Sequence, residues 1–548
     1  MTKTPIEALL HHVQTRPQST AFVFHEEAWS YERIASESAR LARALTAQGV
    51  GAGDRVALHM MNRPEMIVAY YACFQLGAIA APLRTAFTTA ELSGLLQRLT
   101  PTVYLGELSL YYSVAAIDAA ILPRDKRFVI GAGGDSVDPQ SWEMLFDGQE
   151  SNQPSVGSDV HRPAVVINTS GTTTGQPKFV AHSAATLGET AELIALNWGL
   201  SAKDLVVQPL PLAHMGGLGT FLSYINVGAP FVLVESFDAD VVLDAFQRYG
   251  CTFYIGFPYQ YAAMLGRQRA HPRNLSSLRL CLTAGDVCPI ELQQQVSWTF
   301  KAPLYNVWAA SEVVGSVAYG LKLGPVSRVI NTTQIRLVDE IGMEVPNGEV
   351  GELLIRGANV FCGYWNDMPS TEESLTSGWY HTGDLMRLGA DGELWFVSRK
   401  KDIIIRGGTN ISPIEVEEAL VTSHSAVKEA AVVGVPDAAL GQRIFGFVTV
   451  TEHVGESGVS EILDNVAERL AAYKIPEDLK VLDKLPLTPL GKVDRKRLLK
   501  VASDLHEAGE FETRETSPSH SGSTAALLPS LEADVFKRPV AMTPQSGH

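Results

Sequence analysis

A polar loop, Thr169-Ser-Gly-Thr-Thr-Thr-Gly-Gln-Pro-Lys178, has the composition of a phosphate-binding site. Its hydroxyl side chains and backbone N–H groups can donate hydrogen bonds to an anion. Gly171 and Gly175 allow positive φ and a close approach of phosphate oxygens, which a Cβ would obstruct. Loops of this composition are also common as plain surface turns, so this loop alone leaves both interpretations open.

The loop differs from a Walker A loop in its spacing. That pattern is G-x-x-x-x-G-K-[ST], whereas here three residues separate Gly171 from Gly175, and Gln-Pro precedes Lys178. Pro177 also prevents a helix from starting where the P-loop helix would start. The apolar run before the loop, residues 164–167, predicts a buried strand. A nucleotide site of a different geometry is therefore expected.

Four other motifs carry residues that could act on a nucleotide. Asn306-Val-Trp-Ala-Ala-Ser-Glu312 combines an aromatic ring with a carboxylate, and Tyr380-His-Thr-Gly-Asp384 ends in an aspartate after a glycine turn. Arg399 begins a basic cluster, and Leu487-Thr-Pro-Leu-Gly-Lys492 places a lysine on a Pro/Gly loop. Taken singly, each is more often a buried indole, a turn aspartate, a solvated charge cluster or a surface lysine. The presence of all four motifs in one chain is what indicates a function.

Together and in this order, the motifs resemble those of the adenylate-forming superfamily of acyl-CoA synthetases, peptide-synthetase adenylation domains and firefly luciferase. The resemblance covers about residues 20 to 500 and is strongest with acyl-CoA synthetases over Ser398 to Glu418. It implies an enzyme that uses ATP and Mg²⁺ to activate a carboxylic acid as acyl-AMP, with release of pyrophosphate. The acyl group then passes to a nucleophile.

The resemblance also implies which residues bind the nucleotide. The phosphate loop would contribute Thr169, Ser170, Gly171, Thr172, Thr173, Thr174, Gly175 and Lys178. Asn306 would reach the adenine edge, and Trp308 would stack on the ring, where the family more often has Tyr. Ala309 and Ser311 stand in place of the commoner Gly and Thr. The loop of Ala284, Gly285 and Asp286 would lie beside adenine and the acyl pocket.

The remaining roles concern the metal, the ribose and catalysis. Glu312 would hold Mg²⁺, Asp384 would accept hydrogen bonds from the ribose hydroxyls, and Arg399 would assist there. Lys492 matches the mobile catalytic lysine, since an ammonium on a flexible stem can be delivered to developing negative charge. Two more expected roles are a hinge at Lys401 and an acceptor channel at Gly407 and Gly408.

The segment from Pro209 to Thr220 matches the family's segment that closes over the acyl group, with His214 at the gate position. The acid pocket is expected to be lined by Met215, Gly216, Thr220, Phe257, Tyr259 and Ala284, with Gly216 and Gly217 leaving room for bulk. This segment contains no acidic residue that could pair an amino-acid ammonium, and an unpaired buried cation is costly. A neutral-bodied carboxylic acid is therefore expected.

Three interpretations of the function stay open, and the first two differ in the acceptor of the acyl group. The leading one is the thiol of CoA. The second is an amide ligase, similar to coronafacate ligase, that passes the acyl group to an amino acid. The third is a nucleotide-binding scaffold without catalysis, which the presence of Glu312, Asp384, Arg399 and Lys492 argues against.

The arrangement of these motifs requires an α/β architecture. Amphipathic helical stretches alternate with short apolar strands over 31–160 and again to about 282, which predicts doubly wound, mainly parallel subdomains. From about Thr332 a small β subdomain is expected. We predict an adenylation core over 1–398, a hinge over 399–402, a small mobile α+β domain over 403–502, and a disordered tail over 503–548 rich in Ser, Thr, Pro and Gly.

Composition narrows the class of protein further. The 548 residues carry a formal net charge of −16, which argues against non-specific binding to nucleic acid. Five scattered cysteines without a zinc-site spacing, and an N-terminus without an apolar signal region, favour a cytoplasmic protein. The apolar stretch from Met66 to Leu83 predicts a core helix ending at Gly77, followed by a strand, rather than a membrane span.

Overall fold

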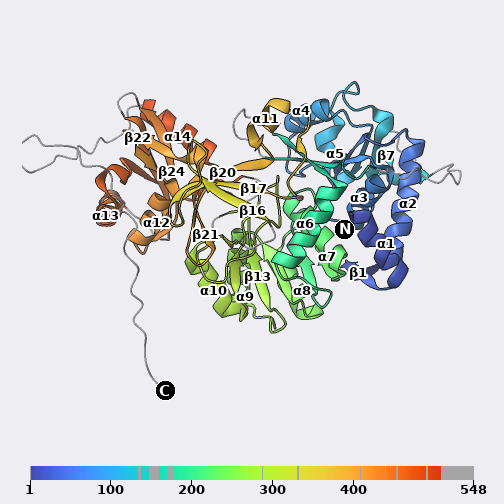
Figure 1. The fold of residues 1–548 in the computed structure, drawn as a ribbon, viewed down its shortest axis with the longest axis horizontal. Coiled ribbons are helices and arrows are strands. Elements are labelled where there is room, and N and C mark those ends of the chain that lie inside the picture. Colours follow the sequence, from blue (N-terminus) through green and yellow to red (C-terminus); the bar gives the residue numbers. More distant parts are fainter. Residues whose placement is uncertain are drawn as a thin grey trace, which may run out of the picture.

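The computed structural model describes most of the chain up to position 507, namely residues 2–133, 138–146, 159–169, 177–286, 288–329, 333–407, 409–437, 440–451, 455–488 and 492–507. Several positions with predicted roles lie outside the described residues: Ser170, Gly171, Thr172, Thr173, Thr174, Gly175 and Gly408. Most of the predicted tail lies outside them too. Figure 1 shows the small domain beside the larger body of the molecule.

The first sheet carries the phosphate loop. Its order is β18-β9-β8-β4-β3-β5-β6-β7, and its strands are parallel except where β9 pairs with β8 and with β18. Short runs of buried apolar residues form it, as expected for a sheet covered on both faces. Its strands are β3 (Arg55–His59), β4 (Ile79–Pro82), β5 (Val103–Glu107), β6 (Arg127–Ile130), β7 (Gln140–Ser141), β8 (Pro163–Asn168), β9 (Phe179–Ser183) and β18 (Gly363–Tyr364).

The second sheet carries the acid-pocket segment. Its order is β14-β13-β12-β10-β11-β1-β2, parallel except for the β1–β2 hairpin. The chain start therefore joins strands some 200 residues later, because β1 pairs with β11. The strands are β1 (Thr20–Phe24), β2 (Glu27–Ser30), β10 (Val206–Gln208), β11 (Phe231–Leu233), β12 (Phe253–Gly256), β13 (Leu280–Thr283) and β14 (Leu304–Asn306).

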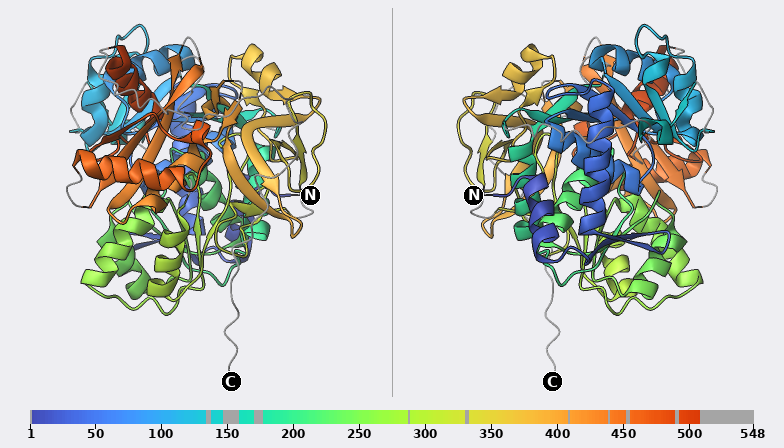
Figure 2. Two further views of the ribbon diagram at one scale, coloured as in Figure 1. Left: turned by 90° about the vertical axis from the view of Figure 1, so that its left-hand side faces the viewer. Right: turned by 90° about the vertical axis from the view of Figure 1, so that its right-hand side faces the viewer.

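Helices cover these two sheets, which confirms the predicted doubly wound α/β class (Figures 1 and 2). Helix α3 begins with Pro64 and ends at Gly77, whose φ of 65° is the left-handed conformation that glycine adopts readily. Within the described residues, no helix is long and apolar enough to cross a membrane. The helices are α1 (Pro5–Thr15), α2 (Tyr31–Ala47), α3 (Pro64–Leu76), α4 (Thr89–Leu99), α5 (Leu108–Ala115), α6 (Ala184–Asn197), α7 (Met215–Val227), α8 (Ala239–Tyr249), α9 (Pro258–Ala270) and α10 (Ile290–Phe300).

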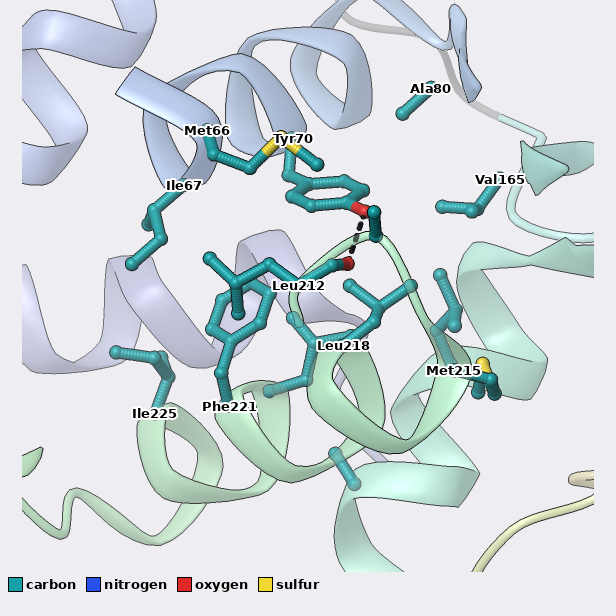
Figure 3. Packing of buried hydrophobic residues seen from close by; sticks show 14 of the residues in the cluster. Met66, Ile67, Tyr70, Ala80, Val165, Leu212, Met215, Leu218, Phe221 and Ile225 are labelled. Atoms are coloured by element: carbon teal, nitrogen blue, oxygen red, sulfur yellow. Dashed lines mark hydrogen bonds between the residues drawn. The ribbon is translucent and has the colours of Figure 1, made fainter. Parts of the chain in front are cut away.

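Packing between α3 and α7 holds the acid-pocket segment in place (Figure 3). Met66 and Tyr70 of α3 are buried in one apolar cluster with Leu218 and Phe221 of α7. The Tyr70 hydroxyl donates a 2.7 Å hydrogen bond to the carbonyl of Leu212, just before α7. Since α7 begins directly after His214, this packing fixes where that histidine lies.

The predicted β subdomain is an antiparallel sheet in the order β15-β21-β20-β17-β16, with β19 beside β20. Pairing of β20 with β21 sets Asp384 opposite Arg399. The elements are β15 (Ser327–Arg328), β16 (Gln334–Val338), β17 (Val350–Arg356), α11 (Met368–Ser374), β19 (Leu375–Thr376), β20 (Trp379–Leu388) and β21 (Glu393–Arg399).

The small domain follows a 3₁₀ turn, Lys400–Asp402, at the predicted hinge. It has its own apolar clusters and a sheet in the order β23-β22-β25-β24, with β26 beside β25. The Ser412 side chain caps the start of α12, and the Glu415 carboxylate in its first turn pairs with Lys474. The elements are β22 (Ile404–Arg406), β23 (Thr409–Ile411), α12 (Pro413–Ser423), β24 (Val427–Asp437), β25 (Gly441–Val450), α13 (Glu456–Ala467), β26 (Asp478–Val481) and α14 (Arg495–Glu507).

Helix α14 corrects the predicted start of the tail at 503. Leu498 and Ala502 on this helix pack into the small domain, so the folded chain continues to Glu507. Other 3₁₀ turns lie at Arg124–Lys126, Trp142–Phe146 and Ala472–Lys474.

Two fully buried histidines should make the protein sensitive to mild acid. Burial lowers the pKa of His59 and of His182 to about 4, from an ordinary value of 6.5. Between these two pH values the unfolded chain binds protons that the folded chain does not, so the free energy of unfolding falls as the pH falls. The slope approaches about 1.4 kcal/mol per pH unit for each histidine.

Urea unfolding across this pH range tests the expectation. The His182→Gln variant should lose one histidine's share of the slope, since glutamine does not titrate. A slope that is the same in the variant and the parent would contradict the assignment.

Candidate active site

A cavity of about 600 Å³ lies where the two parallel sheets, the β subdomain and the small domain meet. Its wall brings together residues more than 300 positions apart in the sequence. Of the residues predicted to form the site, the wall includes Thr169, Lys178, His214, Met215, Gly216, Thr220, Phe257, Ala284, Gly285, Ala309, Ser311, Glu312, Asp384, Arg399, Lys401 and Lys492.

The phosphate loop connects two antiparallel strands, β8 and β9. The backbone N–H of Thr169 donates a 2.8 Å hydrogen bond to the carbonyl of Lys178, which closes the neck of the loop. A P-loop is instead followed directly by a helix. The Lys178 ammonium lies 4.6 Å from the centre of the Tyr364 ring, close enough for a cation–π contact.

Glu312 is held at the cavity by a tight turn and a tyrosine. Ala310 and Val313 bridge the turn, and the backbone carbonyl of Glu312 accepts a 2.9 Å hydrogen bond from Phe361. The Tyr364 hydroxyl donates to Glu312 Oε1 at 2.9 Å. Carboxylate oxygens suit Mg²⁺, which is usually held by one or two carboxylates together with substrate phosphates. The described residues contain no group of three or more His, Cys, Asp or Glu side chains that could hold a metal ion.

Asp384 is a buried carboxylate on the cavity wall, held between Trp308 and Arg399. The Trp308 indole Nε1 donates to Oδ2 at 2.7 Å, and Arg399 Nε lies 3.2 Å from Oδ1. Among the described residues, no group donates a hydrogen bond to Oδ1. Burial raises the pKa of Asp384, and the charge of Arg399 opposes that rise. The arrangement suits an acceptor for vicinal hydroxyl groups.

His214 lies at the start of α7 as a neutral ring. Its Nδ1 accepts a 3.1 Å hydrogen bond from the N–H of Gly216, which assigns the proton to Nε2. Burial lowers the pKa of His214 to about 3, and the charges of Arg84 and Lys492 contribute. His214 can therefore donate a hydrogen bond to a ligand oxygen at neutral pH.

Lys492 reaches the cavity from the small domain. The N–H of Thr488 donates to the carbonyl of Lys492 at 2.7 Å, which closes a turn before α14. Behind it, Arg495 Nη2 lies 2.9 Å from Glu417 Oε2 and anchors the start of that helix. Burial lowers the pKa of Lys492, with a smaller contribution from Arg399, while Asp286 and Asp384 oppose the shift.

Other predicted residues lie elsewhere. The ring of Tyr259, 41% exposed, stacks on Phe257 at 5.9 Å and is not on the cavity wall. Gly217 is also off the wall, and a Cβ there would lie 2.1 Å from the carbonyl oxygen of Pro211, so backbone packing requires this glycine. Further predicted residues off the wall are Asp286, Asn306, Trp308 and Gly407.

Asn306 and Trp308 lie just behind the wall. Asn306 donates from Nδ2 to the carbonyl of Pro325, and its buried Oδ1 has no donor among the described residues. That oxygen could accept from an exocyclic amine. Trp308 is 8% exposed and contacts Asp384, so stacking on adenine stays a prediction.

Seven wall residues lie within the named motifs but were given no role: Leu210, Ala310, Tyr380, His381, Thr382, Gly383 and Lys400. Sequence patterns missed the other wall residues: Arg84, Trp198, Ile255, Gly256, Val314, Glu352, Tyr364, Glu373 and Ser374. Arg84 and Gly256 follow or end parallel strands, at the sheet edge where ligands bind in α/β folds. That topological rule could have found these two.

Comparison with known proteins agrees with this geometry. The AMP-binding enzyme family matches residues 9–365, and the AMP-binding enzyme C-terminal domain matches residues 415–492. An indoleacetate–CoA ligase from Aromatoleum aromaticum is 34% identical, over 88% of this chain and 95% of the relative. A feruloyl-CoA synthase from an Amycolatopsis species is 31% identical, over 87% and 94%.

Solved structures agree as well. The anthranilate CoA ligase AuaEII, in complex with anthranoyl-AMP, superposes with a TM-score of 0.83 at 26% identity, covering 92% of this chain and 98% of that chain. The o-succinylbenzoate CoA synthetase from Bacillus subtilis, in complex with ATP and magnesium, gives 0.78 at 28% identity, covering 90% and 98%. On the strength of these matches, this chain belongs to the AMP-binding, adenylate-forming enzyme family.

Proposed function

We propose that the protein activates an aromatic carboxylic acid as its acyl adenylate and transfers the acyl group to the thiol of CoA. The observation that carries this proposal is the neutral, partly aromatic section of the cavity wall, which adjoins the nucleotide residues. Adenylate formation and acid–thiol ligation are the common activity of the family's relatives, which are named CoA ligases.

We define the acyl section of the cavity wall as the set Trp198, Leu210, Met215, Ile255, Phe257, Ala310 and Val314, and none of these side chains is charged. Trp198 and Phe257 supply aromatic surface, and the Trp198 indole N–H is already bonded to the carbonyl of Val317 at 3.2 Å. The indole therefore offers its ring rather than its donor. The other apolar residues there are Leu210, Met215, Ile255, Ala310 and Val314. A flat ring buries well against such a surface, because aromatic pairs add to area burial.

The names of several relatives point to the same class of acid. Indoleacetate, ferulate, succinylbenzoate and anthranilate all carry an aromatic ring, and these are the acids in the names of four relatives. A medium-chain fatty-acid–CoA ligase from Escherichia coli is also 30% identical over 86% of this chain. The wall composition favours the aromatic class for this protein.

The nucleotide side of the cavity fits ATP. Positive side chains gather on its wall, among them Lys178, Arg399, Lys400, Lys401 and Lys492, in a chain whose net charge is −16. Bound Mg²⁺, held by Glu312 and the phosphates, would neutralise charge on the phosphate chain. Asp384 would orient the ribose, and His214 would donate to an oxygen near the reacting carboxylate.

The first step joins the two substrates. A carboxylate oxygen of the acid attacks the α-phosphorus, the bond to the bridging oxygen of the β-phosphate breaks, and pyrophosphate leaves with the electron pair. Lys492 lies where it can stabilise that charge. In the second step the CoA sulfur attacks the acyl carbon, the thiol proton is lost, and AMP leaves.

We further propose that the second step requires Lys492 to withdraw. The turn at Lys400–Asp402 is the single described connection between β21 and β22, which suits a hinge near Lys401. Rotation there would exchange the Lys492 loop for the face that carries Gly407, whose φ of 57° favours glycine. Gly408 is proposed to share this role.

Product analysis tests the proposed function. Purified protein receives ATP, Mg²⁺ and one acid from a panel of aromatic and aliphatic acids, followed by CoA or mixed amino acids. We expect acyl-CoA, with kcat/KM at least about tenfold higher for aromatic acids than for aliphatic acids of equal length. The Lys492→Ala variant serves as the inactive control.

Two outcomes would contradict the proposal. Acyl-amino-acid formation without CoA would favour the amide-ligase interpretation. Equal kcat/KM for aromatic and aliphatic acids would refute the aromatic class while leaving CoA ligation intact.

A further inference from the structure

Arg84 places a guanidinium group on the cavity wall, and no step described above uses it. It follows β4, which lies beside β8 in the first sheet. Its Nη2 donates a 3.1 Å hydrogen bond to the carbonyl of Asn168, the last residue of β8. Arg84 therefore lies at the base of the phosphate loop, which begins with the next residue, Thr169.

This guanidinium lacks the partners that satisfy other enclosed arginines, which are either a carboxylate or several backbone carbonyls. Arg63 lies 3.3 Å from Glu107, and Arg495 is anchored by Glu417. Arg127 is fully buried but donates to several backbone carbonyls. Among the described residues, no carboxylate forms an ion pair with Arg84, and its buried Nε has no hydrogen-bond acceptor.

An enclosed cation without an acceptor is unfavourable, because desolvation is repaid only by a paired charge or hydrogen bonds. Burial accordingly lowers the pKa of Arg84 to about 10, which still leaves it charged at neutral pH. Arg84 lines the cavity wall, so a ligand in the cavity can contact its guanidinium group and compensate its charge.

The neighbours of Arg84 indicate the charge of that ligand. Arg84, His214 and Lys492 all line the same cavity. The positive charge of Arg84 adds to the effect of burial in lowering the pKa of both His214 and Lys492. The cations Arg84 and Lys492, together with the neutral His214 ring as a hydrogen-bond donor, suit a negatively charged oxygen. In the proposed reaction, that region is where the carboxylate meets the phosphate chain.

We propose that Arg84 is a further binding residue of the adenylation step, which donates to anionic oxygen at the junction between the phosphate loop and the acid pocket. The oxygen belongs either to the phosphate chain of ATP or to the carboxylate of the acid. This inference rests on the adenylation half of the proposed function and is independent of which acid is used.

A purely structural role makes a different prediction. If Arg84 served only to support the Asn168 carbonyl, a neutral donor of suitable length would replace it. Arg84→Gln retains an N–H donor and removes the charge, whereas Arg84→Lys retains the charge and removes the planar fork. A comparison of the two variants therefore distinguishes a role of the positive charge of Arg84 from simple support of the Asn168 carbonyl.

The experiment measures three quantities in both variants and the parent: ATP binding by calorimetry without acid, inhibition by pyrophosphate, and KM for the acid in acid-dependent pyrophosphate exchange. For Arg84→Gln we expect kcat/KM of adenylation to fall about 10- to 100-fold, as for loss of a charge-assisted hydrogen bond. Arg84→Lys should recover at least part of that loss.

The measurements also identify the source of the oxygen. Weaker binding of ATP and pyrophosphate with an unchanged KM for the acid assigns Arg84 to the phosphate chain. An unchanged ATP affinity with a raised KM for the acid assigns it to the carboxylate. Because ATP binding needs no acid, failure of the aromatic-acid proposal would leave this test intact.

Arg55→Met is the matched control. Arg55 lies on β3 in the same sheet, is half-buried, and donates to the carbonyl of Leu99 at 3.1 Å, but it is not on the cavity wall. The control should keep parental kinetics. Parental kinetics in Arg84→Gln, or equal losses in Arg84→Gln and Arg84→Lys, would overturn the proposal. If Arg84→Gln does not fold, parental ATP and acid binding in an Arg84→Cys variant would overturn it, and a loss would support it.

Discussion

Replacement of Lys492 by alanine is expected to abolish acid-dependent ATP–pyrophosphate exchange while a presynthesised acyl adenylate is still converted to acyl-CoA. The ammonium reaches the cavity that also contains Asp384 and Arg399. Among the described residues, Lys492 is the cation that the small domain, which follows the turn at Lys400–Asp402, contributes to the cavity wall. Loss of one transition-state donor typically costs about 3 kcal/mol, or roughly 10²-fold in rate.

The effect should be specific to the first half-reaction. Negative charge develops on the phosphate chain during adenylation, and it has left with pyrophosphate before thiol transfer. Because Lys492 is proposed to withdraw before the second step, its removal should not slow that step. Single-turnover measurements of each half-reaction by mass spectrometry provide the test.

Lys500→Ala is a suitable control, because Lys500 lies on α14 in the same domain and is exposed to solvent. It should behave like the parent in both half-reactions. Equal loss of both half-reactions in the Lys492→Ala variant would refute the division of roles between the two domain orientations.

Replacement of Asp384 by asparagine is expected to weaken ATP use about 10²-fold in kcat/KM. The native carboxylate, 3% exposed, receives the Trp308 indole N–H and pairs with Arg399. The amide cannot neutralise Arg399, although the Arg399 side chain is 46% exposed and solvent screens part of its charge. Asparagine also places an N–H₂ donor where one of the two carboxylate oxygens faced a donor, either the Trp308 indole or Arg399.

The loss should fall on nucleotide binding rather than on the acid. Calorimetric titration with ATP, and KM measured separately for ATP and the acid, would locate it. Trp308→Phe removes the indole donor but keeps the carboxylate, so a smaller loss of about tenfold is expected. An unchanged ATP affinity in Asp384→Asn would contradict the assignment of this residue to the ribose.

Local sequence signals predicted many elements correctly. Helix α3 ends at Gly77, as the apolar pattern predicts, and the buried strand predicted over residues 164–167 is part of β8. These elements depend on apolar periodicity and on caps, which are properties of neighbouring residues.

Elements that depend on distant partners were missed. Strand β9 follows the phosphate loop directly and exists because it pairs with β8 and β18. Strand β18 has two residues, too few for any pattern, and is held by a strand about 180 positions earlier. Pairing over such separations depends on the whole fold, because edge backbone groups must find partners.

The sequence by itself determined which chemistry the chain can perform. The phosphate loop, Glu312, Asp384, Arg399 and Lys492 stand in an order that indicates adenylate formation, and the family comparison confirms the family. Each motif alone has a commoner explanation, so it is the resemblance of the whole ordered set to the adenylate-forming superfamily that indicates this chemistry.

Only the tertiary structure decided which side chains share the cavity. It placed Arg84 and Trp198 on the wall, left Tyr259 outside it, and turned the indole N–H of Trp308 toward Asp384. The physical reason is that burial and electrostatic contact depend on distance in space. The enclosure that lowers the pKa of His214 is built by segments far apart in the chain.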